Sequence, residues 1–354
     1  MKIAIIGGGI NGLMIARQLE INNHDVSLFE RDSLMCGTSS KSTKLLHGGI
    51  RYLEQFHFSQ VKESLKERDF WLNYAPDLVS PLEIIIPIYK ESYRKRWIYL
   101  SGLHLYNFLA GKRNIRKHQK YSKEELLKIE PSLSSEGLIS GLSFFDAQMD
   151  DYKLGLFIAD IIKDRGVKIF TNREVSKIKT DGRLFFNDQS SLVFDKIINA
   201  SGPYAERLLK KSGIKCEKSI DLIRGSHIIF DEKINSSFLL ESNDKRLFFV
   251  ISYDNKTMVG TTEVRQDIDD RVTASKEEFI YLLNAYNKYF HRKKTKKDII
   301  DFFSGVRPLI RSKDDPNQIS REYGFEVVGN LVTVFGGKWT SSRSLAEKCS
   351  RLIG

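Results

Sequence analysis

Cysteine is scarce in this chain of 354 residues, which contains only three. Cys36, Cys216 and Cys349 lie far apart in the sequence and form neither a CxxC pair nor a zinc-binding spacing. This pattern predicts reduced thiols in a cytosolic protein, excludes the cysteine pair of a disulfide reductase, and suggests no metal site. Internal repeats and low-complexity linkers are also missing, so we expect any domains to be interleaved.

Long apolar stretches are missing as well. The chain never reaches the roughly 18 consecutive apolar residues that a membrane-spanning helix needs. Its first residues, MKIAIIGGG, have no signal-peptide cleavage site and run directly into a glycine motif, so they predict a strand. Hydrophobic residues make up 41% and charged residues 29%, which is ordinary for a folded globular protein.

Positive charge is in excess, with a net charge of +11, and part of it lies in two segments. Residues 94–120 hold eight Lys/Arg and no acid around the aromatic stretch WIYLSGLHLYNFLAG. Basic flanks around an amphipathic aromatic helix suit an anionic membrane surface, while an ordinary packed helix with a polar end explains them equally well. The second segment, KYFHRKKTKK at 288–297, favours a solvated surface.

Nucleic acid is not an expected partner, because no recognised binding module accompanies the charge. The expected reduced thiols predict a cytoplasmic protein. Peripheral contact with the cytoplasmic face of the membrane through residues 94–120 is left open.

A glycine motif stands at the start of the chain. The apolar run Lys2–Ile6 leads into Gly7, Gly9 and Gly12, which form GxGxxG, and helical spacing follows. These glycines allow a tight turn, close approach to a pyrophosphate, and close packing of helix on strand. Glu30 ends the next strand, DVSLFE, where a carboxylate accepts hydrogen bonds from ribose hydroxyls. The unit predicts a dinucleotide site; the absence of a second GxGxxG favours FAD over NAD.

The rest of the chain predicts a second part beside the nucleotide unit. A chain of this length exceeds the roughly 250 to 300 residues of a single core, so two interleaved domains are expected. The predicted strands are Glu83–Tyr89, Val167–Phe170, Val175–Ile178, Lys196–Asn199, Leu222–Phe230, Arg246–Ser252 and Thr257–Thr262. The predicted helices include Asp151–Arg165 and Lys276–Phe290, and a strand, a Gly-Gly turn and a helix close the chain.

Taken together, these elements predict an α/β fold with an α+β substrate part. A Rossmann-like FAD-binding domain is expected to be interleaved with an antiparallel-sheet substrate domain that roofs a pocket. The predicted FAD-binding domain comprises residues 1–80, 145–215 and 300–354, and the predicted substrate domain comprises 81–144 and 216–299.

Several motifs, all in one order, resemble those of the FAD-dependent glycerol-3-phosphate dehydrogenases of the D-amino-acid-oxidase-like flavoprotein superfamily. They are GGGINGLMIA, CGTSSKSTKLLHGGIRYLE, QMDDYKL, INASGP, LIRGSHIIF, VGTTEV, SGVRPLI, ISREY and VFGGKWTSSRSLAE. Two departures stand out. The helical C-terminal domain usual in the family is absent from this sequence, and Trp339 and Ser341 occupy positions of the GGKLTT motif.

The resemblance implies oxidation of the secondary alcohol of glycerol 3-phosphate to dihydroxyacetone phosphate, with hydride passing to FAD and electrons to a quinone or another acceptor. Arg51, Arg307 and Arg321 are the candidates for the phosphate, because a guanidinium binds two oxygens at once. His227 is the candidate base, Lys338 a positive charge at the flavin or substrate, and Tyr52 a donor to substrate. The predicted catalytic set is His227, Arg307, Lys338 and Arg51.

The resemblance and the glycine motifs also imply a set of cofactor-binding residues. These are Gly7, Gly9, Asn11, Gly12, Glu30, Arg31, Thr38, Ser39, Ser40, Ser42, Lys44, Leu46, His47, Gly48, Gly49, Val175, Ala200, Ser201, Gly202, Gly336, Gly337, Lys338, Trp339 and Thr340. Two alternatives remain open: a flavoenzyme of the same fold acting on a 2-hydroxy acid or an amine, and a non-catalytic FAD-binding protein.

Overall fold

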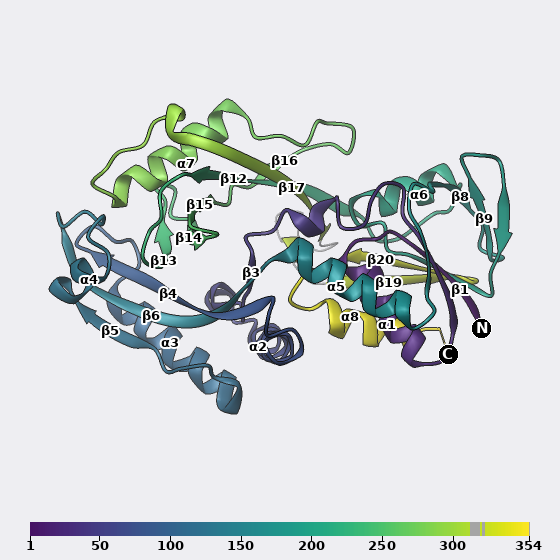
Figure 1. The fold of residues 1–354 in the computed structure, drawn as a ribbon, viewed down its shortest axis with the longest axis horizontal. Coiled ribbons are helices and arrows are strands. Elements are labelled where there is room, and N and C mark those ends of the chain that lie inside the picture. The colour runs from purple at the N-terminus through teal and green to yellow at the C-terminus, as the bar shows by residue number, and fades with distance from the viewer. Residues whose placement is uncertain (312–318, 321–322, 354) are drawn as a thin grey trace.

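The computed structural model describes residues 1–311, 319–320 and 323–353. Two large sheets lie toward opposite ends of the long axis, and both chain termini lie beside the smaller one (Figure 1). Within the described residues, no helix combines the length and the apolar character that crossing a membrane demands.

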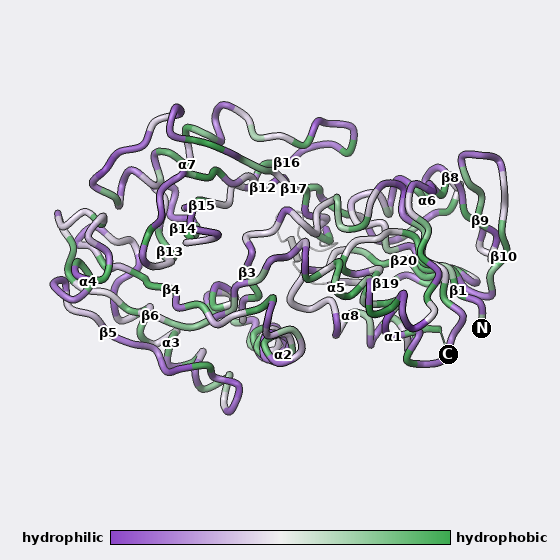
Figure 2. The backbone as a smooth tube through the Cα atoms, viewed as in Figure 1, coloured by the Kyte–Doolittle hydropathy of each residue, from purple (hydrophilic) through white to green (hydrophobic). Residues whose placement is uncertain are grey.

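The smaller sheet is the dinucleotide-binding type that the glycine motif predicts. Five of its strands run parallel, and β19 pairs antiparallel at one edge. In spatial order the strands are β19 (Tyr323–Val328), β20 (Leu331–Gly336), β11 (Lys196–Asn199), β1 (Lys2–Ile6), β2 (Asp25–Phe29) and β7 (Lys168–Phe170). The central strands are apolar and buried because layers of structure cover both faces, and hydrophobic segments concentrate around β1 and β20 (Figure 2).

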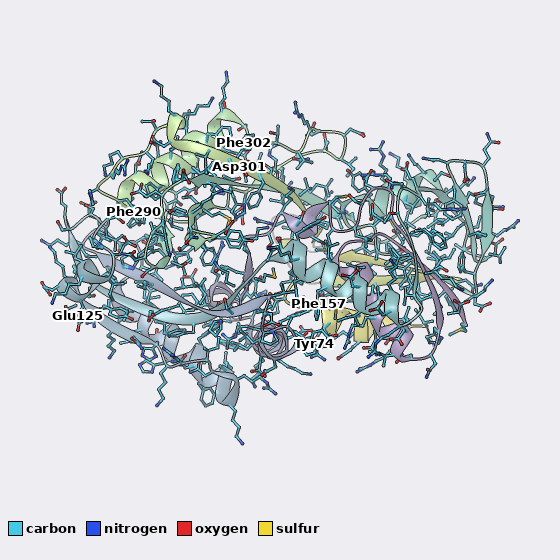
Figure 3. All side chains as sticks on the ribbon, viewed as in Figure 1. Tyr74, Glu125, Phe157, Phe290, Asp301 and Phe302 are labelled. Carbon is cyan, nitrogen blue, oxygen red and sulfur yellow. The ribbon has the colours of Figure 1, made fainter. Side chains whose placement is uncertain are left out.

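Three helices pack together in the core of this part: α1 (Ile10–Ile21), α5 (Asp151–Asp164) and α8 (Ser342–Ser350). The buried indole of Trp71 joins the same core from α2 (Phe58–Tyr74), and it meets Trp339 edge to face at 5.6 Å. Tyr74 of α2 and Phe157 of α5 also pack ring against ring (Figure 3). Helix α2 therefore links the smaller sheet to the rest of the molecule.

A third, small sheet packs on the end of the nucleotide unit beside α6 (Ala205–Lys211). Its strands are β8 (Val175–Ile178), β9 (Arg183–Phe186) and β10 (Ser191–Val193). The rings of Phe29, Phe186 and Phe194 meet between the two sheets.

The larger sheet is mostly antiparallel and contains the strands of the predicted substrate part. In spatial order they are β18 (Ile319–Ser320), β17 (Ile299–Arg311), β12 (Ile220–Phe230), β15 (Lys256–Gly260), β14 (Leu247–Tyr253), β13 (Ser237–Glu241), β4 (Val79–Tyr89), β6 (Leu138–Met149) and β3 (Leu45–Leu46), with β16 (Val264–Arg265) beside β12 and β5 (Gln119–Ser122) beside β6. Helices α3 (Arg96–Ala110), α4 (Lys123–Ile129) and α7 (Lys276–Tyr289) pack on this sheet.

Short 3₁₀ turns complete the described chain: η1 (Thr38–Ser40), η2 (Ile50–Gln55), η3 (Gly111–Arg113), η4 (Gly202–Tyr204) and η5 (Lys296–Asp298). The predicted fold class is confirmed, and the predicted strands and helices are present within a few residues of their expected ends. Strand β6, which pairs with β4 along almost its whole length, was not predicted from the sequence.

The predicted domain boundaries stay a prediction, and the sheets refine one of them. Residues 300–354 were assigned to the FAD-binding part. Strand β17, however, pairs with β12 from Ile220 to Phe230 and so belongs to the larger sheet. The segment crosses between the parts at this point, since the following strands β19 and β20 return to the smaller sheet.

Candidate active site

A cavity of about 980 Å³ lies where the two sheets meet. One end is walled by residues that follow β1, β2 and β11, at the carboxyl ends of parallel strands, where doubly wound sheets bind ligands. The other end is walled by β17 and by Thr261, which follows β15 of the larger sheet. Residues of both the nucleotide-binding part and the substrate part therefore wall this one cavity.

The glycine turn between β1 and α1 forms the first wall. Gly7 has φ +111°, and a Cβ there would meet the carbonyl oxygen of Ala200 at 2.6 Å. A Cβ on Gly12 would stand 1.9 Å from the carbonyl oxygen of Gly7, so only glycine lets the helix pack this close. A Cβ on Gly9 would meet Ser39 Oγ at 2.9 Å. The geometry agrees with a tight turn at Gly7 and with close packing of α1 at Gly12, and the close approach to a pyrophosphate stays a prediction.

Glu30 lies at the end of β2, on the cavity wall. Its carboxylate accepts from the backbone N–H of Gly8 at 2.6 Å and from that of Asp32 at 2.9 Å. These bonds fix the carboxylate beside the glycine turn and leave lone pairs for a further donor. Glu30, Asp32 and Cys36 also bring ligand atoms within 4.8 Å of one another, but the two backbone bonds give the Glu30 carboxylate a role without an ion.

Residues 38–42 run between the two ends of the cavity. Hydrogen bonds to three other segments hold them there. Thr38 Oγ1 donates to the carbonyl of Val306 on β17 at 2.6 Å. Ser39 Oγ accepts from the N–H of Ile10 at the start of α1, at 3.0 Å. The indole Nε1 of Trp339 donates to the carbonyl of Ser39 at 2.7 Å. Trp339 therefore stabilises this segment.

Asp151, the first residue of α5, is fully buried and holds the end of the same segment. Its carboxylate accepts from the backbone N–H of Ser42 at 3.0 Å and from Ser42 Oγ at 2.7 Å. Lys44 Nζ forms an ion pair with the other oxygen. Ser42 and Lys44 thus bind protein groups, and Thr43 between them is held by both neighbours.

A second buried carboxylate holds the Gly48-Gly49 turn. Asp146 Oδ1 accepts from the N–H of Gly48 at 2.9 Å, from Tyr106 Oη at 2.6 Å and from Arg68 Nη1 at 2.9 Å. Asp146, Tyr106 and Arg68 are each at most 1% exposed. A Cβ on Gly48 would stand 2.1 Å from Tyr106 Oη. The turn that follows His47 and precedes Arg51 is therefore held in place by buried side chains.

Four cationic side chains line the far end of the cavity: Lys41, Arg51, Arg307 and Lys338. Arg307 Nη2 donates to Thr261 Oγ1 at 2.7 Å, and its Nη1 lies 3.7 Å from the carboxylate of Glu263. Lys338 Nζ lies 4.4 Å from the centre of the Tyr52 ring and bonds Ser64 Oγ at 3.3 Å. This end attracts an anion, since the cations exceed the acids on its wall.

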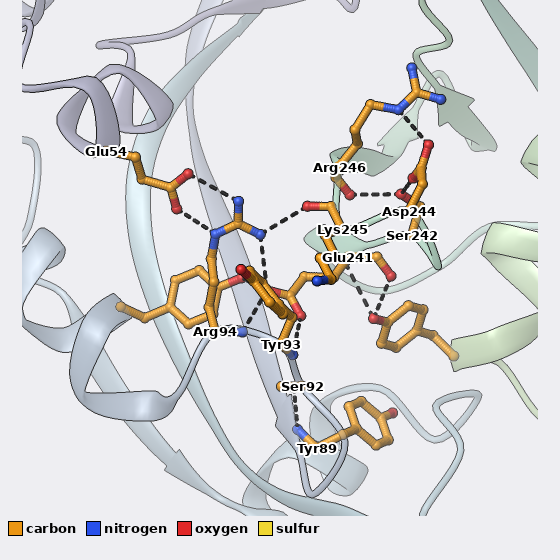
Figure 4. A network of polar contacts seen from close by, with 12 residues as sticks. Glu54, Tyr89, Ser92, Tyr93, Arg94, Glu241, Ser242, Asp244, Lys245 and Arg246 are labelled. Atoms are coloured by element: carbon orange, nitrogen blue, oxygen red, sulfur yellow. Dashed lines mark hydrogen bonds and ion pairs between the residues drawn. The ribbon is translucent and has the colours of Figure 1, made fainter.

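Arg94 ties the 3₁₀ turn that bears Arg51 to the larger sheet (Figure 4). Its guanidinium pairs with Glu54 at the end of η2 and with Glu241 of β13. Glu241 also accepts from Tyr99 Oη at 2.8 Å. The turn is therefore held on one side by Asp146 and on the other by this network.

His227 lies on β12 beneath the same end of the cavity and is 1% exposed. Nε2 is 3.1 Å from Thr43 Oγ1, and the ring stacks on Phe303 at 4.7 Å. Burial, followed by the charges of Arg307 and Lys44, holds the pKa of His227 well below its usual 6.5. The imidazole is therefore neutral near pH 7. The cavity wall at this point is made by Thr43 and Thr261.

Most predicted site residues line the cavity. They are Gly7, Gly9, Asn11, Glu30, Arg31, Thr38, Ser39, Ser42, His47, Arg51, Tyr52, Val175, Ala200, Ser201, Gly202, Arg307, Gly336, Gly337, Lys338, Trp339 and Thr340. The predicted residues that do not line the cavity are Gly12, Ser40, Lys44, Leu46, Gly48, Gly49 and His227. Arg321 lies outside the described residues.

Other wall residues were missed by the sequence analysis. Thr43 and Thr261 stand inside quoted motifs but were assigned no role, because a threonine gives no signal without its neighbours in space. At the opposite end, the missed residues are Tyr204, whose ring centre lies 4.5 Å from the guanidinium of the predicted Arg31, and Arg173, which lies 4.4 Å from the ring centre of Phe186. Arg31 and Tyr204 come from distant parts of the sequence, whereas Arg173 and Phe186 flank β8.

The residues present fit FAD. Two buried polar atoms of lining residues, Asn11 Oδ1 and Arg173 Nε, have no hydrogen-bond partner in the described part of the chain. Such atoms carry a desolvation cost unless a ligand or water meets them. Asn11 stands in the glycine turn, at the start of α1, where helix N-termini favour pyrophosphate. The Gly336-Gly337 turn adds a second close backbone approach, with φ values of +73° and +96°.

Comparison with known proteins agrees with this fit. Residues 2–348 match the family model described as FAD dependent oxidoreductase. The chain is 35% identical to the glycerol-3-phosphate dehydrogenase of Pseudomonas aeruginosa, over 98% of this chain and 70% of that protein. It is 33% identical to the D-erythritol 1-phosphate dehydrogenase of Brucella abortus, over 97% of this chain and 72% of that protein.

Solved structures give the same result. The glycerol-3-phosphate dehydrogenase from Bacillus halodurans, solved in complex with FAD, superposes with a TM-score of 0.78 at 26% identity. The match covers all of this chain and 64% of that one. The glycine oxidase from Geobacillus kaustophilus has a TM-score of 0.76 at 19% identity, a likeness of fold alone.

Proposed function

This chain belongs to the FAD-dependent oxidoreductase family, and on that basis we propose that it oxidises glycerol 3-phosphate to dihydroxyacetone phosphate. The observation that carries the proposal is the single cavity that runs from the glycine turn to Arg51, Arg307 and Lys338. Two relatives that share about a third of its residues are named for polyol phosphates. A phosphate dianion matches the cationic end.

The roles of the protein groups follow from their positions. Arg307 and Arg51 bind the phosphate, since a guanidinium offers paired donors to its oxygens. Arg307 is pre-aligned by its bond to Thr261. Lys338, beside Tyr52, places positive charge next to the Gly336-Gly337 turn, and Tyr52 contributes a phenolic donor. Arg321, from the ISREY motif, stays a candidate third phosphate ligand.

The reaction removes a hydride from the secondary carbon and a proton from its hydroxyl. Bound FAD supplies the chemistry of hydride acceptance. The protein must take the proton, and the neutral imidazole of His227 is its proposed destination. Because His227 is buried, water is kept away from the nitrogens of its ring. Electrons then pass to a quinone or another acceptor.

A four-carbon polyol phosphate is a second candidate substrate, favoured by the relative named for D-erythritol 1-phosphate. A 2-hydroxy acid or an amine is the rival of another class, since arginines also bind carboxylates. Comparison of glycerol 3-phosphate, D-erythritol 1-phosphate, lactate and glycine as reductants of the bound flavin separates these candidates. The proposal expects the highest kcat/KM for glycerol 3-phosphate. A preference for lactate or glycine would reject a phosphate substrate.

We propose in addition that helix α3 meets an anionic membrane surface. Trp97 and Phe108 are 69% and 80% exposed. Eleven residues at 100° each amount to about 20° more than three whole turns, so both rings point to one side of the helix. Lys95, Arg96 and the basic residues of η3 stand at its two ends. Aromatic rings between basic ends suit the headgroup region.

A further inference from the structure

We propose that Thr43 is a catalytic residue that passes the proton of the substrate's secondary hydroxyl to His227. The proposal rests on the proposed function, because it concerns the same oxidation. His227 lies behind the wall of the cavity, whereas Thr43 is part of that wall and bonds His227 directly. A substrate in the cavity therefore reaches the imidazole through the threonine hydroxyl.

The bonding capacity of the hydroxyl fits this task. A threonine hydroxyl has one O–H to donate and two lone pairs that accept. Donation to Nε2 of His227, 3.1 Å away, uses the O–H and leaves the lone pairs for a donor in the cavity. The substrate hydroxyl is such a donor. The structure does not fix the direction of this bond; the proposal uses the tautomer of His227 that carries its proton on Nδ1, which is buried and has no hydrogen-bond partner in the described part of the chain.

The proton balance is simple. As the carbon–hydrogen bond breaks and its electron pair leaves as hydride to the flavin, the substrate O–H proton moves to Thr43 Oγ1. The original Thr43 proton moves in the same step to Nε2 of His227. The threonine ends as it began, the alcohol carbon is oxidised to a carbonyl, and His227 carries one additional proton.

The surroundings hold both partners of the relay in place. The residues on either side of Thr43 bind one carboxylate: Ser42 through two hydrogen bonds and Lys44 through an ion pair, all to Asp151. On the other side, Phe303 stacks on the imidazole, and a Cβ on Gly260 would meet His227 Cδ2 at 2.1 Å. These contacts hold the chain on both sides of Thr43, and they hold one face and one edge of the imidazole.

The surroundings of His227 oppose a lasting proton on its ring. Burial first, and then the charges of Arg307 and Lys44, lower the pKa of the imidazole. A phosphate dianion bound at Arg307 offsets part of that repulsion only while substrate is present. The base is thus best able to accept a proton when a phosphate-bearing substrate occupies the cavity.

Thr43→Val and Thr43→Ser form a matched pair for the test, since valine keeps the shape and serine keeps the hydroxyl. The measurement is the rate at which glycerol 3-phosphate bleaches the flavin without air, with FAD content and Tm measured on each variant. We expect a loss on the order of 30-fold or more for Thr43→Val and no more than about threefold for Thr43→Ser. Combination with His227→Gln should add little to either single change.

A second readout needs no turnover. In ¹⁵N NMR spectra of the FAD-loaded protein without substrate, the Nε2 signal of His227 should move in Thr43→Val and stay in Thr43→Ser. A wild-type rate in Thr43→Val, or an equal loss in Thr43→Ser, would overturn the relay while leaving the proposed function intact. If polyol phosphates fail to bleach the wild-type flavin, the proposed function fails and the relay falls with it.

Discussion

Arg307 and Thr261 meet at the cavity wall, where Arg307 Nη2 donates to Thr261 Oγ1 over 2.7 Å. The two residues come from neighbouring regions of the larger sheet, 46 positions apart in sequence. The bond aims a guanidinium into a cavity whose other end is built by the glycine turn. A phosphate held here places the rest of a small substrate between the two sheets.

The first prediction follows from this contact. Arg307→Ala should raise the KM for glycerol 3-phosphate by roughly 10- to 150-fold, because a lost charge-assisted contact costs about 1.5 to 3 kcal/mol. FAD should remain bound, since Arg307 stands at the end remote from the glycine turn. Steady-state kinetics and flavin absorbance measure both. Arg311→Ala is the control on the same strand, because Arg311 pairs with Asp221 away from the cavity. Equal KM values in the two variants would remove Arg307 from the site.

The second prediction concerns the glycine turn. Gly12→Ala should abolish tight FAD binding, because its Cβ would stand 1.9 Å from the Gly7 carbonyl oxygen and push α1 away from the turn. Flavin content of the purified variant measures the effect. Gly102→Ala in α3 is the control, since a Cβ there has no heavy atom within 4 Å, and alanine should stabilise the helix by up to about 1 kcal/mol. Full flavin content in Gly12→Ala would contradict the account.

The third prediction uses the buried histidine. The pKa of His227 is lowered in the folded state, so between that value and 6.5 the unfolded chain binds more protons than the native one. Stability from this group is therefore present above pH 6.5 and is lost as pH falls below it, by up to about 1.4 kcal/mol per pH unit. Urea titrations from pH 7.5 to 5.5 should show a steeper loss for wild type than for His227→Gln.

His291→Gln provides the comparison for that experiment, because His291 is exposed. It should follow the wild-type slope. If His227→Gln and wild type lose stability in parallel, His227 is not the neutral buried group that the structure indicates.

The fourth prediction addresses helix α3. The protein should sediment with vesicles that contain anionic lipid, and less so as salt is raised, because the basic ends of the helix are screened. Replacement of Trp97 and Phe108 by serine should reduce binding at constant charge. Ile280→Ser removes another exposed apolar side chain, on α7, and should have no effect. If the wild-type protein does not sediment with anionic vesicles at low salt, the proposal that α3 meets a membrane surface is wrong.

The nucleotide-binding unit could be predicted from the sequence because its signals are local. Gly7, Gly9 and Gly12 stand within one short motif, where Gly12 packs against Gly7, and Glu30 bonds the same turn from the next strand. The buried carboxylates Asp146 and Asp151 act across long separations instead: Gly48 and Asp146 are 98 positions apart. No local pattern marks such a pair, so the supports of the Gly48-Gly49 turn emerged only from the fold.

The same distinction explains the predicted base. The GSHI motif singled out His227, but its burial and its contact with Thr43, 184 positions away, depend on how β12 packs against the loop. Strand β6 was missed for a related reason, because its pairing with β4 defines it more than its own composition does. The surroundings of His227 and the formation of β6 both depend on contacts between distant parts of the chain.

The proposed function requires that one cavity bind both FAD and a polyol phosphate. Purified protein should carry oxidised flavin, and glycerol 3-phosphate added without air in an amount equal to the flavin should bleach its visible absorbance, while glycerol should not. Flavin that stays oxidised with glycerol 3-phosphate but is bleached by lactate or glycine would contradict the claim.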